Sequence, residues 1–217
     1  MRLFTPALVA CMLATLSASI TASARVGETQ EEFERRLLQP AIGKFIPREK
    51  NPDPAREEEI LRQQPFNQVR VHFPDGIRER KYWKSAVPNV LSNDNGWRVH
   101  VFFHDNVSVL EAYQRVGDSM NEFEIQNILR ANQGTSEWQR VEPDSIEATS
   151  SVIGCDYQLA DGTLRARVVK GWLIVYSVKL DDYVKEQLRV SEEKRRTQEE
   201  ERVRQQQSSA PNSTSGF

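Results

Sequence analysis

A phrase of ten residues occurs twice in this chain, and each copy is expected to fix the start of a helix. The copies read RVGETQEEFE at residues 25–34 and RVGDSMNEFE at residues 115–124. The glycine at the third position lets the backbone turn sharply. Thr29 and Ser119 follow it, and each is itself followed three positions later by a glutamate. This spacing is typical of a capping box, in which a hydroxyl and a carboxylate satisfy free N–H groups at a helix start.

Each copy of the phrase leads into segments that alternate as strands do. The predicted strands are residues 68–73, 77–83, 97–104 and 107–114 after the first copy, and 137–142, 152–159, 164–169 and 172–180 after the second. Asp105-Asn106, Asp161-Gly162 and Lys170-Gly171 are typical of tight hairpin turns. Strands joined in this way pair antiparallel. The sequence therefore predicts an α+β fold of two tandem modules, each a capped helix followed by an antiparallel β-meander.

The first 24 residues have the pattern of a signal peptide. Met1-Arg2 is positively charged, an apolar run extends from Leu3 to about Ile20, and Ala22-Ser23-Ala24 supplies the small residues of a cleavage site. We expect cleavage after Ala24 and a periplasmic or secreted protein. A lipoprotein is the alternative, with Cys11 lipidated, but the apolar run continues past this cysteine. No other segment is long and apolar enough for a membrane span.

The remaining chain divides into four predicted parts. Residues 25–114 form the first module and residues 115–180 the second. Residues 181–207 form a charged helix, because glutamate and arginine recur four positions apart, and residues 208–217 form a disordered polar end. The apolar residues of the charged helix are too few for a coiled-coil seam, which favours a single helix.

Charge and cysteine content exclude several classes of protein. The chain has 29 basic and 31 acidic residues, and loss of Arg2 with the signal leaves 28 against 31, a formal charge of −3. This balance gives no bulk attraction for nucleic acid. Once Cys11 is removed, Cys155 has no partner for an internal disulfide. Cys155 lies in an apolar predicted strand, so we expect a small buried residue rather than a nucleophile.

No motif for a nucleophile, a phosphate or a zinc ion is present, and neither a cofactor nor a metal is expected. The three histidines, His72, His100 and His104, all fall on predicted strands of the first module. His100 and His104 would lie about 13 Å apart along one strand, too far to hold a single ion.

A basic face of the predicted sheet is the best candidate for a binding site. Alternation places Arg70 and His72 outward on one strand, and Arg98, His100 and Phe102 on one side of another. The strand at 77–83 is expected to add Arg78, Arg80 and Tyr82. These segments contribute no acidic residue to the face in this phase, so it suits an acidic protein surface or an anionic polymer of the cell envelope. An ordinary solvated face is the alternative.

Two resemblances follow from these residues. Val26-Gly27-Glu28-Thr29 resembles the helix start of the tandem α-β modules in the β-lactamase inhibitor protein and in the small lipoprotein of the outer-membrane assembly machinery. The second glycine of that pattern is absent from residues 37–40. Residues 25 to about 180 also resemble uncharacterised exported bacterial proteins, in the features Trp97, Asp105-Asn106, Val107-Ser108, Glu111-Ala112-Tyr113, Ile128-Leu129, Asn132 and Trp138. The first resemblance implies a binding module, and the second implies no activity.

Two classes of function remain open. The sequence favours an exported, non-catalytic protein that binds a partner through its sheet. The alternative is an enzyme of the cell envelope whose site is assembled from scattered polar residues. A pocket lined by convergent titratable groups would favour the enzyme, and an open or concave surface would favour binding.

Overall fold

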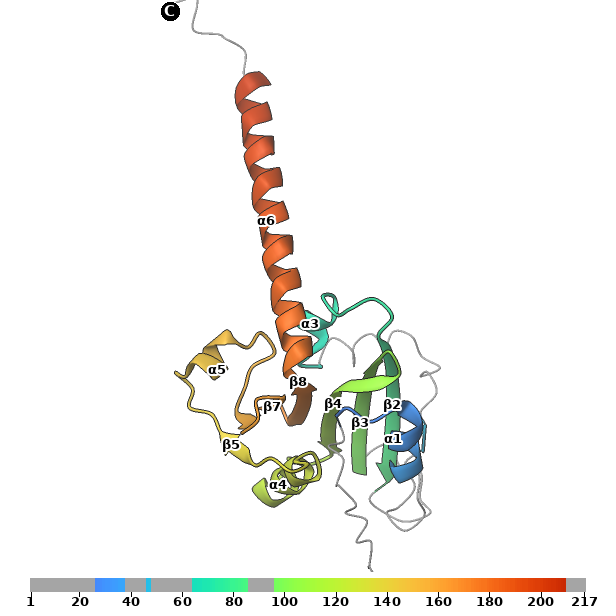
Figure 1. The fold of residues 1–217 in the computed structure, drawn as a ribbon. Coiled ribbons are helices and arrows are strands. Elements are labelled where there is room, and N and C mark those ends of the chain that lie inside the picture. Colours follow the sequence, from blue (N-terminus) through green and yellow to red (C-terminus); the bar gives the residue numbers. More distant parts are fainter. Residues whose placement is uncertain (1–25, 38–45, 48–63, 86–95, 210–217) are drawn as a thin grey trace, which may run out of the picture.

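The computed structural model describes residues 26–37, 46–47, 64–85 and 96–209, which build an antiparallel sheet with helices on both faces (Figure 1). The helices are α1 (Gln30–Leu37), α3 (Asn67–Arg70), α4 (Glu122–Ala131), α5 (Ile146–Ser150) and α6 (Val178–Ser209). The strands are β1 (Ile46–Pro47), β2 (Arg78–Ser85), β3 (Gly96–His104), β4 (Val107–Val116), β5 (Trp138–Arg140), β6 (Tyr157–Leu159), β7 (Leu164–Val169) and β8 (Trp172–Ser177). The predicted α+β class and long C-terminal helix are confirmed. The predicted signal peptide, residues 1–24, lies outside the described residues.

Strands β2 to β8 form a single sheet in the order β2-β3-β4-β8-β7-β6-β5, and the short β1 pairs with the free edge of β2. Both meanders run inward, because β2 leads through β3 to β4 and β6 leads through β7 to β8. The two meanders meet where β4 pairs with β8, from Leu110 opposite Tyr176 to Gln114 opposite Trp172. We call β2–β4 the first half of the sheet and β5–β8 the second half.

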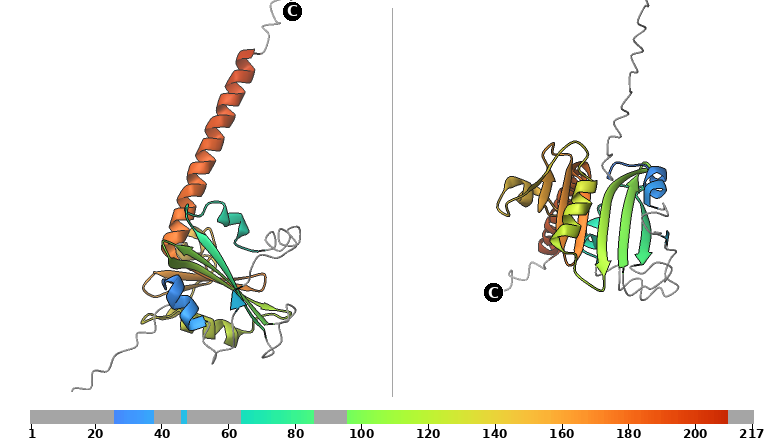
Figure 2. Two further views of the ribbon diagram at one scale, coloured as in Figure 1. Left: turned by 90° about the vertical axis from the view of Figure 1, so that its right-hand side faces the viewer. Right: turned by 90° about the horizontal axis from the view of Figure 1, so that it is seen from below.

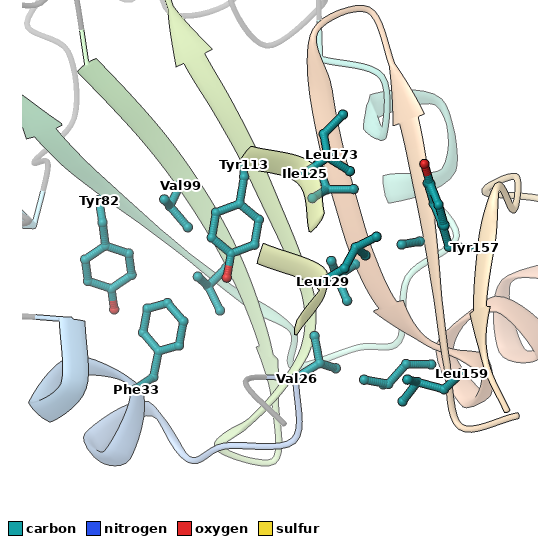
Figure 3. Close-up of a cluster of buried hydrophobic side chains, with 14 of the residues drawn as sticks. Val26, Phe33, Tyr82, Val99, Tyr113, Ile125, Leu129, Tyr157, Leu159 and Leu173 are labelled. Atoms are coloured by element: carbon teal, nitrogen blue, oxygen red, sulfur yellow. The ribbon is translucent and has the colours of Figure 1, made fainter. Parts of the chain in front are cut away.

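Each face of the sheet carries its own hydrophobic core. Helices α1 and α4 cover one face, while α3 and the first turns of α6 cover the other (Figure 2). Phe33 of α1 and Leu129 of α4 belong to the first core, which spans both halves of the sheet (Figure 3). Phe66, Leu180 and Val184 belong to the second core. Neither face of the sheet is therefore left open over its centre.

Helix α1 begins as its sequence predicts. The hydroxyl of Thr29 accepts a hydrogen bond from the N–H of Glu32 at 3.3 Å, and the Glu32 carboxylate accepts one from the N–H of Thr29 at 3.0 Å. This is the reciprocal capping box. Gly27, which precedes it, has φ +106°, a backbone conformation that glycine adopts without strain.

Helix α4 begins two residues later than predicted, and its cap is Asn121 rather than Ser119. The Asn121 side chain accepts the N–H of Glu124 at 2.9 Å, and the Glu124 carboxylate accepts the N–H of Asn121 at 3.0 Å. The N–H of Ser119 instead donates to the carboxylate of Asp118 at 2.7 Å. The second phrase therefore contains a capping box, but in a different register from the one its likeness to the first copy suggested.

Two of the predicted hairpin turns have the backbone conformation that a two-residue loop requires. Asp105 and Asn106 both have positive φ, 50° and 65°, as do Lys170 and Gly171, with 50° and 76°. Positive φ at both central residues matches the right-handed twist of the paired strands. The hairpins β3–β4 and β7–β8 follow directly.

The predicted strand at residues 68–73 is wrong. Asn67–Arg70 form the short helix α3, and turns follow up to β2. The apolar residues of this segment are also spaced as in a helix, because Phe66, Val69 and Phe73 stand three and four positions apart. All three pack in or against the second core, whereas Val71 is 78% exposed. The sequence of this segment fits both the alternation of a strand and the spacing of a helix, and packing against the second core selects the helix.

The predicted phase of β2 is also wrong. Tyr82 pairs with Val99 and Arg80 with Val101, and directly paired residues project from the same side of a sheet. Tyr82 therefore lies in the first core, where its ring centroid is 5.4 Å from that of Phe33. Glu79 pairs with Phe102, so an acidic residue occupies the face that was expected to be purely basic.

The second half differs from prediction at two strand ends. Of the expected strand 152–159 only β6 is extended, and the expected strand 172–180 gives way to α6 at Val178. The buried Asp181 joins these two places. Its carboxylate accepts the N–H groups of Val152 and Ile153, each at 3.1 Å, and pairs with Arg165 at 2.8 Å.

Helix α6 leaves the sheet and projects well beyond it (Figure 1). Its 32 residues begin at Val178, and residues 191–207 are all exposed. Arginine–glutamate pairs three or four positions apart run along it, such as Arg189 with Glu186 and Glu193, both at 2.6 Å. Such pairs stabilise a helix that is polar on every side. Ser208 and Ser209, expected in a disordered end, close this helix.

Candidate functional site

The structure does not bring the predicted basic face together as a free surface. Arg98, His100 and Phe102 lie on β3 as expected, but His100 is only 2% exposed and Phe102 is fully buried. Arg70 belongs to α3 and His72 to the turn after it, because the strand that should have carried them does not form. The segment from Phe66 to Phe73 lies over this part of the sheet.

Aromatic rings enclose His100. Phe66 and Trp172 approach it with ring centroids at 5.9 and 5.3 Å, and Phe66 also packs edge-on against Phe102 at 5.3 Å. These contacts connect the α3 segment, β3 and β8 within the second core. A partner could reach His100 or Phe102 only if the α3 segment moved away. These residues are therefore part of the core in this fold.

Glu79 is the acidic residue that the sequence analysis missed. Its carboxylate contacts the guanidinium of Arg70 and Nδ1 of His100, each at 2.7 Å. Burial opposes the ionisation of Glu79, but the hydrogen bond with His100 and the charges of His100, Arg70 and Lys81 outweigh it, so its pKa is lowered. Burial also lowers the pKa of His100, against the opposing effect of Glu79. The arrangement fixes α3 to the sheet.

Cys155 is buried, as predicted, and is poorly suited to be a nucleophile. Burial raises the pKa of its thiol to about 11, and the thiol donates to the carbonyl of Tyr157 at 3.4 Å. A reactive cysteine needs the opposite, a lowered pKa in an electropositive setting. Among the described residues, no three histidine, cysteine, aspartate or glutamate side chains are grouped as metal ligands.

A cleft of about 770 Å³ opens at one end of the sheet, at the boundary between its two halves. The pairing of β4 with β8 stops at Leu110, and residues 26–29 run beside the start of β4 instead. There the N–H of Gly27 donates to the carbonyl of Ser108 at 2.9 Å, and the N–H of Ser108 donates to the backbone carbonyl of Glu28 at 2.8 Å. The cleft lies where β8 turns into α6 and leaves this end of the sheet.

The walls of the cleft are largely apolar. The lining includes buried members of the two cores, Val26, Leu159, Leu164 and Leu180, and Figure 3 labels Val26, from the segment before α1, and Leu159 of β6. Val107, Val109 and Val178 are half-buried and complete the apolar lining. The volume is within the range of about 300–1,000 Å³ that is usual for small-molecule sites.

Few titratable groups reach the rim of the cleft. His104 Nδ1 lies 3.7 Å from the carboxylate of Asp105. Asp161 accepts hydrogen bonds from the N–H and hydroxyl of Thr163, at 2.9 and 2.6 Å, and these bonds lower its pKa. Lys179 and the partly exposed Tyr183 complete the titratable lining. His104 and Asp161 are thus engaged with neighbours on their own hairpins rather than with each other.

Sequence reasoning could not have found this cleft, because its lining comes from six separate stretches between Val26 and Tyr183. Most of the lining consists of valines, leucines, glycines and hydroxyl residues, none of which is distinctive on its own. The one available signal was the end of the apolar strand pattern near Val178, where a helix replaces the predicted strand.

Helix α6 has the length of a membrane span, but its charges rule out that role, and none of the other described helices is both long and apolar enough.

Comparison of the chain with protein-family models, with curated proteins and with solved structures found no match. The resemblances stated from the sequence therefore stay predictions.

Proposed function

We propose that this protein is an exported, non-catalytic binding protein, and that it holds an apolar group of its ligand in the cleft between the two halves of the sheet. The observation that carries the proposal is the cleft itself, about 770 Å³ in volume with valine and leucine walls and few titratable groups. A large apolar pocket with a few polar groups is the usual form of a ligand site. The proposal keeps the binding function expected from the sequence and moves the site away from the sheet face.

The chemistry of the rim supports binding rather than catalysis. General acid–base catalysis needs groups that converge on a reacting atom. Here the two groups best suited to it, His104 and Asp161, contact Asp105 and Thr163. Valine and leucine side chains supply much of the remaining lining, and Ser108 is its one buried polar residue among those described. These features favour a site that holds a ligand without transforming it.

We further propose that the two halves are tandem modules joined edge to edge. Each half is a meander that runs toward the centre of the sheet, and each is preceded by a helix with a capping box. The cleft then lies at the junction of the modules, where recognition sites are often found. Separate expression of residues 25–116 and 117–207 tests this idea. A folded first or second module alone supports it, and two unfolded fragments oppose it.

The binding proposal can be tested with a neutral apolar dye such as N-phenyl-1-naphthylamine, whose fluorescence rises in apolar surroundings. Val178→Trp places a large ring at the wall of the cleft, and we expect it to weaken dye binding at least tenfold. Val190→Trp is the matched control, because Val190 lies on the same helix and does not line the cleft. Thermal unfolding of both variants checks that they fold. Equal dye binding by wild type and both variants would refute the proposal.

The export proposal has its own test. The protein recovered from periplasm or culture medium should begin at Arg25. Recovery of a chain beginning at a lipidated Cys11 would contradict cleavage after Ala24.

A further inference from the structure

We propose that the ligand of the cleft is a single-chain anionic amphiphile, whose apolar chain lies against the valine and leucine walls and whose anionic group lies beside Lys179. This inference rests on the proposed binding function and specifies the class of ligand. It also retains the anionic character of the partner that the sequence suggested, but at a different place on the molecule.

The shape and lining of the cleft favour a chain. The apolar wall passes from Val26 and Leu159 of the first core to Leu180 of the second core, so it extends past the end of the sheet from one face to the other. A flexible aliphatic chain can follow such a wall, and each methylene that it buries there strengthens binding. A ligand that was polar along its length would leave its hydrogen-bonding groups unpaired against aliphatic side chains.

Lys179 favours an anionic end group. It is the second residue of α6, it is exposed, and its ammonium forms no ion pair with any of the described residues. Beside an apolar wall the effective dielectric constant is lower than in water, so an unpaired cation attracts an anion more strongly there.

Among the described residues that line the cleft, Asp161 is the one carboxylate, and it allows a test of the same idea with the opposite charge. Two hydrogen bonds from Thr163 already stabilise its negative charge, so it does not need a cationic ligand as a partner. Its charge repels an anionic ligand. Two opposing effects should therefore set the preference of the cleft for an anionic over a cationic ligand. Lys179 attracts the anion, and we expect the repulsion by Asp161 to be weaker.

The experiment measures displacement of the neutral dye by dodecanoate, dodecanol and dodecylamine, each below its micelle concentration, from the mature protein at neutral pH. We expect dodecanoate to bind most tightly and dodecylamine least. Lys179→Ala should weaken dodecanoate about fivefold and leave dodecanol unchanged, because the neutral head does not use the charge. Lys185→Ala, on the same helix but outside the cleft, is the matched control. Asp161→Asn should tighten dodecanoate by about twofold.

Chain length gives a second readout. Decanoate should bind roughly tenfold more weakly than dodecanoate, because it lacks two buried methylenes. Tighter binding of dodecylamine than of dodecanoate, or an unchanged dodecanoate affinity in Lys179→Ala, would overturn the assignment of the ligand class. Such results would leave the binding function intact, since the neutral dye and Val178→Trp test that function separately.

Discussion

The two copies of the ten-residue phrase begin helices in different registers, although six of their ten residues are identical. Phe33 and Phe123 occupy the same place in the phrase. Phe33 is fully buried between α1 and the sheet, whereas Phe123 is 74% exposed on α4. A helix-start signal therefore specifies that a helix begins nearby, and the surroundings decide which residue caps it and which side chain faces the core.

The surroundings of the two copies differ in what holds the chain just before the helix. In the first copy, β4 and the turn before it fix residues 26–30, since Gly27 and Gln30 donate their N–H groups to the carbonyls of Ser108 and Asn106. In the second copy the first two residues are also the last two of β4, which ends at Val116. Arg115 pairs with Glu124 of α4. The chain must leave its strand before a helix can form, so α4 starts two residues later.

The largest test of this comparison removes the two phenyl rings. Phe33→Ala should lower the free energy of unfolding by about 4 kcal/mol, because it leaves a cavity in the first core. Phe123→Ala should change it by less than about 0.5 kcal/mol, because its ring is mostly in solvent. Urea unfolding of both variants measures the difference. Similar losses in the two variants would mean that the two phrases pack alike.

The next test concerns Asn132, the C-cap residue of α4, which connects the end of this helix to the first copy. Its side chain is fully buried, accepts the N–H of Val26 at 3.1 Å and donates to the carbonyl of Ile128 at 3.0 Å. Asn132→Ala leaves a buried N–H unpaired, and we expect a loss of about 2 kcal/mol in unfolding free energy. Asn127→Ala, at an exposed position of α4, is the control and should be nearly neutral. Equal stability of both variants would contradict the connection.

A third test distinguishes the two capping registers. Thr29→Ala and Asn121→Ala should each lower the unfolding free energy by about 1 kcal/mol, because each removes the acceptor for an N–H in the first turn of its helix. Ser119→Ala should cost less than about 0.5 kcal/mol, since the Ser119 hydroxyl is not the cap. A larger loss for Ser119→Ala than for Asn121→Ala would restore the register that the likeness of the phrases suggested.

The smallest effect is electrostatic and sharpens the comparison at α1. The hydrogen bonds from the N–H and the hydroxyl of Thr29 lower the pKa of Glu32 below its ordinary 4.5. The contribution of this carboxylate to stability is therefore fully present above pH 4.5 and is lost as the pH falls through the lowered value. In Thr29→Ala the pKa of Glu32 should rise, and in Ser119→Ala it should stay as in wild type. Carbon-detected NMR titration of the carboxyl group measures both, and an unchanged pKa in Thr29→Ala would exclude the box in solution.

Much of the sheet was predictable, because local chemistry dictates it. Strands β3, β4 and β7 begin and end within two residues of prediction, since alternating apolar residues and turn dipeptides frame them. The errors fall where one segment contains two patterns, or where contacts with a neighbouring element decide the conformation. Phe66, Val69 and Phe73 carry a helical spacing inside an alternating segment, and only their packing in or against the second core selects the helix. The phase of β2 depends on its register with β3, which its own residues do not specify.

The candidate site could not be predicted for the same physical reason. A basic face was expected from side chains that alternate along two strands, yet both faces of the sheet are covered and Glu79 contacts His100. The cleft arises instead where β8 stops pairing with β4 and a helix begins. Its walls are shared among strand ends, a hairpin and the first residues of α6, so no single segment contains its pattern.

The attachment of α6 makes the helix a lever. The Asp181 carboxylate, with its ion pair to Arg165 and its bonds to Val152 and Ile153, fixes the first turn to the second half of the sheet. From Asp181 to Ser209 the helix extends about 42 Å, so a tilt of about 10° at its base moves its tip by roughly 7 Å. Lys179, Leu180 and Tyr183 of the same base line the cleft. An occupant that shifts these residues by a fraction of an ångström would be read out, magnified, at the far end of the helix.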